Sequence, residues 1–203
     1  STNTKAPSPR ADHHMTSLGA GKVALFGGWE YSQQHLFDTW EFDQNNKHWT
    51  QLYHPQPTIK SPQAREFHEM APLEGGKLLM FGGYDDGHFL RDAWVFDPFM
   101  VDWALVDNPP TPKLLTARAQ FAMASLGKGN VVLFGGWAQN GQYLNDTWVF
   151  HQSNKNWTAP TTHTPPPRGL HAMASLGEGK VVLFGGYNGN QQLGDTWIFY
   201  QSS

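Results

Sequence analysis

Four arginines recur along the chain, each at the start of a short segment that ends in methionine. The segments read RADHHM from Arg10, REFHEM from Arg65, RAQFAM from Arg118 and RGLHAM from Arg168. Downstream of each arginine, one aromatic residue follows a Gly-Gly pair; these are Trp29, Tyr84, Trp137 and Tyr187. A guanidinium group binds carboxylates bidentately, and Trp and Tyr give rigid contact area at low entropic cost. These eight residues are therefore candidates for binding a partner with acidic character.

Histidine recurs at one position of the same segments, in three of the four copies. His13, His68 and His171 occupy it, and Phe121 stands there in the remaining copy. Three imidazoles that converge can bind a metal ion. Because Phe121 replaces the imidazole without other change, we favour a packing or backbone-bonding role and expect no metal and no cofactor.

Composition excludes several classes of function. The 203 residues hold 14 basic and 17 acidic side chains, for a net charge of -3, and no run of like charges. We therefore expect no nucleic-acid partner and no binding to an anionic membrane surface. Cysteine is absent, which excludes disulfides, thiolate metal sites and a cysteine nucleophile. No stretch approaches the roughly 20 apolar residues that span a bilayer.

The arginine segments belong to a sequence repeat that occurs four times in the chain. Gly-Gly pairs recur at intervals of 55, 53 and 50 residues, from position 27 to 82, 135 and 185. The repeated residues that we expect to be structural are Gly27, Gly28, Gly82, Gly83, Gly135, Gly136, Gly185 and Gly186, the tryptophans Trp40, Trp94, Trp148 and Trp197, and the later tryptophans Trp49, Trp103 and Trp157. Length variation is confined to the Pro-rich connections, so we expect one domain over 1–203 with blades at about 10–55, 65–108, 118–162 and 168–203.

Each unit predicts a four-stranded antiparallel meander. The run from Val131 to Phe134 has no polar alternation, which is typical of a strand covered on both faces, and short Gly-containing turns precede such runs. A single sheet cannot bury both its faces, so the copies must stack face to face around an axis. The sequence therefore predicts an all-β propeller, in which the Gly-Gly pair permits positive φ and close backbone packing. We expect Asp38, Asp92, Asp146 and Asp195 to hold a loop through side-chain-to-backbone hydrogen bonds.

The apolar run, Gly-Gly, aromatic residue, variable loop, DTW and later Trp resemble the kelch repeat over essentially the whole chain. The resemblance implies a kelch-type β-propeller. In similar kelch domains of BTB-type ubiquitin-ligase adaptors, arginines at the start of the inner strand and tyrosines after Gly-Gly hold acidic peptides. The resemblance therefore implies the same binding role for the four arginines and the four aromatic residues after Gly-Gly that are named in the first paragraph. A kelch oxidase resembling galactose oxidase needs a copper site with a Tyr–Cys cross-link, and the absence of Cys excludes that activity.

The fourth unit ends early. After Trp148 the chain reads VFHQSNKNW, whereas after Trp197 it reads IFYQSS, so we expect the last blade to lack its outer strand. Three arrangements remain open: part of a longer propeller, a closed four-bladed ring, and a half-ring that a second copy completes as a homodimer. An open array would expose two apolar blade faces.

These observations favour a non-catalytic protein-interaction module or scaffold that binds a protein or peptide on the propeller face. A first alternative is a carbohydrate-binding or sugar-converting propeller, since aromatic rings stack on sugars. A second is a structural, self-associating repeat array. The acidic residues Glu30, Glu66, Glu69 and Asp86 are scattered singly, so we expect no enzyme.

Overall fold

Each repeat folds into one antiparallel sheet, which we call a blade and number in chain order. A computed structural model describes residues 6–31, 34–52, 61–106, 115–160 and 164–201. Strand follows strand in each blade because the apolar runs are separated by tight turns with residues at positive φ, such as Ala20, Lys128 and Glu178. The predicted blade limits at 55, 108 and 162 lie outside the described residues.

Blades 1 to 3 contain four strands each, in the sequential order of a meander. Blade 1 consists of β1 (His14–Gly19), β2 (Lys22–Phe26), β5 (Thr39–Asp43) and β6 (His48–Leu52). Blade 2 consists of β7 (Glu69–Pro72), β8 (Leu78–Phe81), β11 (Ala93–Asp97) and β12 (Asp102–Leu105), with a 3-10 turn at Glu74–Gly76. Blade 3 consists of β14 (Ala122–Gly127), β15 (Asn130–Phe134), β17 (Thr147–His151) and β18 (Asn156–Thr158).

Blade 4 has three strands, β19 (Ala172–Gly177), β20 (Lys180–Phe184) and β21 (Thr196–Tyr200). The prediction of an all-β kelch-type propeller with four blades, the last without its outer strand, is confirmed. No helix among the described residues is long and apolar enough to cross a membrane.

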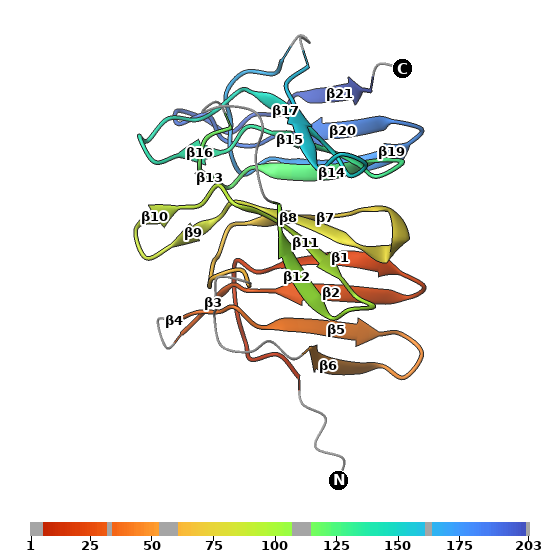
Figure 1. Cartoon of the computed structure of the whole chain (residues 1–203). Helices are drawn as coiled ribbons and strands as arrows, with labels where there is room; N and C mark the ends of the chain where they lie inside the picture. The colour runs from red at the N-terminus through yellow and green to blue at the C-terminus, as the bar shows by residue number, and fades with distance from the viewer. Residues whose placement is uncertain (1–5, 32–33, 53–60, 107–114, 161–163, 202–203) are drawn as a thin grey trace.

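Short strands project from one end of the blades and form what we call the loop face. They are β3 (Trp29–Glu30) with β4 (Gln34–His35), β9 (Tyr84–Asp85) with β10 (His88–Phe89), and β13 (Arg118–Ala119) with β16 (Trp137–Ala138). Figure 1 shows these two-stranded sheets on the same side of the stack, beside the larger sheets. The variable loops of the sequence therefore gather on one surface.

Neighbouring blades bury their apolar faces against each other. Between blades 2 and 3, for example, Leu79 and Phe81 of one sheet pack with Met123, Leu133 and Trp148 of the next. Residues 131–134 are covered on both faces, with exposures of 0 to 2%, as their unbroken apolar run predicts. Face-to-face packing of the blades therefore supplies the main core.

Backbone hydrogen bonds join the same pair of elements at each of the three junctions. The second glycine of a Gly-Gly pair donates to the arginine carbonyl of the next blade: Gly28 to Arg65 at 2.9 Å, Gly83 to Arg118 at 2.9 Å, and Gly136 to Arg168 at 2.8 Å. These glycines have φ between 96° and 106°, and a Cβ on the preceding glycine, as at Gly135, would lie 2.6 Å from the Arg168 oxygen. Glycine is thus required by both the backbone conformation and the close approach.

The described blades do not close into a ring. Contacts link β1 to β7, β7 to β14 and β14 to β19, whereas β19 and β1 form no comparable junction. In Figure 1 blade 1 lies at the bottom and blade 4 at the top. On the outward face of blade 4, Leu176 is 55% exposed and Phe184 is 57% exposed. The alternative of a closed four-bladed ring is therefore wrong for the described residues.

Candidate functional site

The loop face carries the four aromatic residues that follow the Gly-Gly pairs. Each pairs through its backbone with the residue after the repeated arginine: Ala11 with Trp29, Glu66 with Tyr84, Ala119 with Trp137, and Gly169 with Tyr187. The antiparallel hairpin brings the start of the inner strand beside the end of the second strand, as the sequence indicated. The aromatic residues are therefore held at fixed backbone positions.

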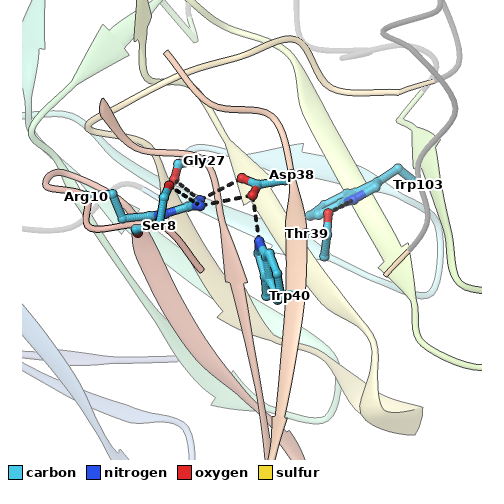
Figure 2. Close-up of polar contacts among 7 residues, drawn as sticks. All are labelled: Ser8, Arg10, Gly27, Asp38, Thr39, Trp40 and Trp103. Atoms are coloured by element: carbon cyan, nitrogen blue, oxygen red, sulfur yellow. Dashed lines mark hydrogen bonds and ion pairs between the residues drawn. The ribbon is translucent and has the colours of Figure 1, made fainter. Parts of the chain in front are cut away.

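The four repeated arginines do not lie on the surface with them. The side chains of Arg65, Arg118 and Arg168 are fully buried, and that of Arg10 is 3% exposed. Figure 2 shows the arrangement in blade 1, where the guanidinium of Arg10 lies between Gly27 and Asp38. Nη1 donates to the Gly27 carbonyl at 3.0 Å and to Asp38 Oδ1 at 2.6 Å, while Nη2 donates to Asp38 Oδ2 at 2.9 Å.

This network recurs in every blade. Each arginine Nε also donates at 3.1 Å to a carbonyl two residues earlier, and each paired carboxylate accepts a further bond from a tryptophan indole at 2.5 to 2.7 Å. The donors are Trp40, Trp94, Trp148 and Trp197, two residues after the aspartates. In blade 3 all five guanidinium N–H groups of Arg118 are used.

One sequence-based expectation is wrong in this respect, and a second is incomplete. Arg10, Arg65, Arg118 and Arg168 cannot grip a partner's carboxylate, because burial and their own hydrogen bonds leave no donor facing solvent. The four aspartates bind a guanidinium and an indole, and not only neighbouring backbone groups. The Arg–Asp–Trp set holds the first strand, the Gly-Gly turn and the third strand of each blade together.

The aspartate pKa values follow from this environment. Burial alone would raise the pKa of Asp146, but the hydrogen bonds from Arg118, its positive charge and the indole of Trp148 outweigh burial and lower it. For Asp195 the hydrogen bonds from Arg168 are the main cause, and they hold the pKa well below its usual range. The carboxylates are therefore ionised at neutral pH, as a bidentate ion pair requires.

A groove of about 300 Å³ opens on the loop face between blades 2 and 3. Tyr84 and Phe89 lie edge to face at 5.4 Å, and Phe89 and Trp137 do so at 5.4 Å. Trp137 is 37% exposed. Three consecutive aromatic rings, with the side chain of Gln120 beside them, therefore line an accessible site.

The side chain of Gln139 fixes the two loops that form this groove. Its Oε1 accepts the Phe89 N–H at 3.1 Å, and its Nε2 donates to the Gly87 carbonyl at 3.4 Å. The hairpin of blade 2 is thus tied to the loop of blade 3. A groove built in this way loses little conformational entropy when it binds.

Three carboxylates surround the side chain of His35 beside the groove. His35 Nδ1 lies 3.4 Å from Asp85 and 3.3 Å from Asp86, and its Nε2 lies 3.6 Å from Glu66. Burial raises the pKa of Glu66 and of Asp85. His35, Asp85 and Asp86 are the one group of three metal-ligand-type side chains among the described residues. Of the carboxylates around His35, that of Glu66 belongs to the wall of the groove.

The repeated histidines pack inside the junctions between blades. The rings of His68 and His171 lie edge to face with Phe26 and Phe134 of the preceding blade, both at 5.5 Å. Neither ring has a well-aligned hydrogen-bond partner among the described residues. Burial is the main reason that the pKa of His171 falls to about 4, and the positive charge of the nearby Arg168 lowers it further. Burial is also the main cause of the low pKa of His68. Both rings are neutral at pH 7.

Phe89, Gln120 and Gln139 were not among the residues singled out from the sequence. Of the predicted partner-binding residues, the structure brings only Tyr84 and Trp137 to the groove. Tyr187 lies farther along the loop face against Tyr143, with ring centroids at 5.8 Å, and Trp29 pairs with β4 at the first blade. The sequence gives no specific signal for Phe89, because a single apolar residue in a surface loop is common and does not by itself mark a binding site.

Comparison with known proteins agrees with this architecture. The family model described as the KLHDC2/KLHL20/DRC7 Kelch-repeats domain matches residues 1–130 and 106–203, and thus the whole chain. The chain is 31% identical over 140 residues to Kelch domain-containing protein 2 of Bos taurus, covering 68% of this chain and 32% of that protein. It is 31% identical over 176 residues to the F-box/kelch-repeat protein At1g51550 of Arabidopsis thaliana, covering 80% of this chain and 36% of that protein.

A more distant relative has a biosynthetic name. The tRNA wybutosine-synthesizing protein 4 of Saccharomyces cerevisiae is 25% identical over 163 residues, which cover 79% of this chain and 22% of that protein. The chain spans about a third of the length of the first two relatives. Kelch-repeat proteins are typically non-catalytic and generally act as protein-interaction modules. The four Gly-Gly blades and the family match together establish that this chain belongs to the kelch-repeat family.

Proposed function

We propose that the chain is a non-catalytic protein-interaction module whose groove between blades 2 and 3 binds a segment of a partner protein. The observation that carries the proposal is the row of Tyr84, Phe89 and Trp137 on an accessible, pre-ordered surface. Aromatic side chains that are partly exposed around a groove are typical of binding hot spots.

The partner segment that fits best has an apolar or aromatic side chain beside a basic one. The aromatic rings would contact the apolar side chain, and Glu66, the acidic residue in the wall of the groove, would face the positive charge. This differs from the acidic partner expected from the sequence, since the arginines that would have bound it are buried. Electrostatic complementarity of this kind favours selection of one partner over others.

Selection from a displayed library of random 12-residue peptides tests the proposal. We expect the bound peptides to share an apolar or aromatic residue flanked by Lys or Arg, and Trp137→Ala to weaken their binding at least tenfold. Phe99→Ala is the matched control, because Phe99 is 84% exposed but lies outside the groove. Acidic consensus peptides, or equal binding to Trp137→Ala, would refute this assignment of the site.

Two alternative functions, carbohydrate binding and self-association, are each favoured by a specific observation. The same rings with the amides of Gln120 and Gln139 would suit a carbohydrate, and saturable binding of a sugar with no selected peptide would favour that alternative. Self-association is favoured by the exposed Leu176 and Phe184 at the open end of blade 4, where a homodimer would complete a larger propeller.

A further inference from the structure

His35 brings an imidazole of blade 1 up to two neighbouring aspartates of blade 2. Its Nδ1 lies 3.4 Å from Asp85 Oδ1 and 3.3 Å from Asp86 Oδ1. One ligand-type atom from each of the three residues lies within 4.8 Å of the other two. Because His35 belongs to β4 and the aspartates to the hairpin of β9 and β10, the group spans the junction between the two blades (Figure 1).

The two distances match the spacing of ligands around a metal ion better than that of hydrogen-bonded partners. Charge-assisted N–H···O bonds are about 2.7 to 2.9 Å long. Zinc binds imidazole nitrogen and carboxylate oxygen at about 2.0 to 2.2 Å, so two ligands at a tetrahedral angle lie about 3.4 Å apart. The Nδ1 of His35 lies at this separation from both aspartates.

The negative charge around His35 is not balanced by neighbouring cations. Three carboxylates, those of Glu66, Asp85 and Asp86, lie close to the ring, and no Lys or Arg in the described part of the chain forms an ion pair with them. Three ionised carboxylates and one protonated imidazole would together carry a charge of -2. The side chains of Glu66 and Asp85 are 12% and 26% exposed, so water screens this charge only in part. A divalent cation would neutralise it.

The second ring nitrogen of His35 faces a carboxylate, as the free nitrogen of a metal-binding histidine usually does. Nε2 lies 3.6 Å from Glu66 Oε1. A carboxylate on this side favours the proton on Nε2, which leaves the lone pair of Nδ1 for an ion beside Asp85 and Asp86. Glu66 is therefore a positioning residue for the imidazole.

Backbone contacts hold these side chains in place. Leu36, next to His35, accepts the Arg65 N–H at 3.2 Å, which joins the loop of blade 1 to blade 2. Asp86 and Gly87 form a two-residue hairpin turn, and both have positive φ, at 41° and 91°. The histidine and the aspartates are thus carried by backbone segments of fixed geometry, so that binding of an ion needs little further ordering.

We propose that His35, Asp85 and Asp86 bind a divalent first-row transition metal ion such as Zn²⁺. The imidazole ligand favours such an ion over Ca²⁺ and Mg²⁺, which prefer oxygen ligands. Three protein ligands leave one position open, and Asp86, whose side chain is 88% exposed, places that position at the solvent. Water or a side chain of a partner protein completes the coordination.

The ion would tie the loop of blade 1 to the hairpin of blade 2. The three ligands do not line the groove between blades 2 and 3, so the metal site is distinct from the proposed binding site for a partner segment. The proposal departs from the sequence-based expectation of no metal, which was drawn from the repeated histidines. His35 is not one of them, and about 50 residues separate it from the aspartates.

Isothermal titration calorimetry of the metal-free whole chain with Zn²⁺ at pH 7 tests this site. We expect one ion to bind per chain with a dissociation constant below about 10 μM, and Ca²⁺ to bind at least tenfold more weakly. His35→Gln and Asp86→Gly should each weaken Zn²⁺ binding at least tenfold. Glycine is chosen at position 86 because Gly-Gly forms the same hairpin turn, so this variant removes the carboxylate and keeps the fold.

His48→Gln is the matched control, because His48 is an exposed histidine at the start of β6, and it should leave the affinity unchanged. Trp137→Ala, in the groove, should also leave it unchanged. Zn²⁺ should raise the melting temperature of the unmodified chain but not of Asp86→Gly, since an ion that binds only the folded state stabilises it. Absence of saturable Zn²⁺ binding, Ca²⁺ binding of equal strength, or Zn²⁺ affinity that either His35→Gln or Asp86→Gly leaves unchanged would overturn the proposal.

Discussion

Replacing Arg118 with methionine is expected to lower the free energy of unfolding by about 2 to 3 kcal/mol, because it leaves the Asp146 carboxylate, whose side chain is 33% exposed, without its guanidinium partner. The Trp148 indole would be the remaining side-chain donor to that carboxylate. The carbonyls of Gly135 and Thr116 would also lose a buried donor. Urea denaturation at pH 7 measures the change directly.

Arg91→Met is the control, since Arg91 is exposed, and it should change the stability by less than about 0.5 kcal/mol. A double-mutant cycle with Asp146→Asn should show that the two changes are far from additive, because they remove the same interaction. Should Arg118→Met prevent folding, Arg118→Lys retains the charge but not the bidentate geometry and is expected to lose an intermediate amount. A loss no greater than that of Arg91→Met would contradict the structural role assigned to the arginines.

Acid is expected to destabilise the protein through its buried histidines before the aspartates become protonated. The pKa of His171 falls to about 4 in the folded state, from 6.5 for a free imidazole, so the unfolded chain binds more protons between these values. The stabilisation is complete above pH 6.5 and is lost as the pH falls toward 4. His171→Phe should therefore reduce the loss of stability between pH 7 and pH 4.5 by about 2 to 3 kcal/mol.

Blade 3 provides the reciprocal control. Phe121 occupies the histidine position there and packs against Phe81 at 5.7 Å, so Phe121→His should make the loss of stability on acidification larger. The paired aspartates do not interfere, because their pKa values are lowered and their contribution is lost only at pH values below 3.8. An unchanged difference between pH 7 and pH 4.5 in His171→Phe would show that this ring is not buried in neutral form.

The blades could be predicted because the four copies of the repeat can be aligned with one another. Gly-Gly, the DTW segment and the outer tryptophan recur in register, and each has one steric explanation that holds in every copy. The apolar run before Gly135 predicted a strand buried on both faces, and its side chains are buried in the structure. Even the missing strand of blade 4 followed from the residues after Trp197.

The partners of the repeated arginines could not be assigned from the aromatic residues near them. The paired residues lie 27 or 28 positions apart in each blade, and only the fold brings the guanidinium and the carboxylate together. The signal was nonetheless present, since Asp38 and its counterparts recur as strictly as the arginines. Opposite charges that repeat in every blade indicate structure, whereas recognition is expected in residues that differ among the blades.

The groove between blades 2 and 3 could not be predicted from the sequence, because only the fold brings its residues together. Phe89 and Gln139 belong to variable loops, in which the residues differ from one repeat to the next. Comparison of the repeats therefore gives no indication that these two residues are in contact. Their proximity depends on the angle between two blades, which a single repeat does not contain.

Hydrogen exchange at four glycine amides tests the open stack of blades most directly. Gly28, Gly83 and Gly136 donate to the arginine carbonyl of the next blade, while the N–H of Gly186 has no such acceptor among the described residues. At low micromolar protein concentration, we expect the first three amides to be strongly protected and Gly186 to exchange orders of magnitude faster. Protection of Gly186 equal to that of Gly136 under these conditions would contradict the open arrangement.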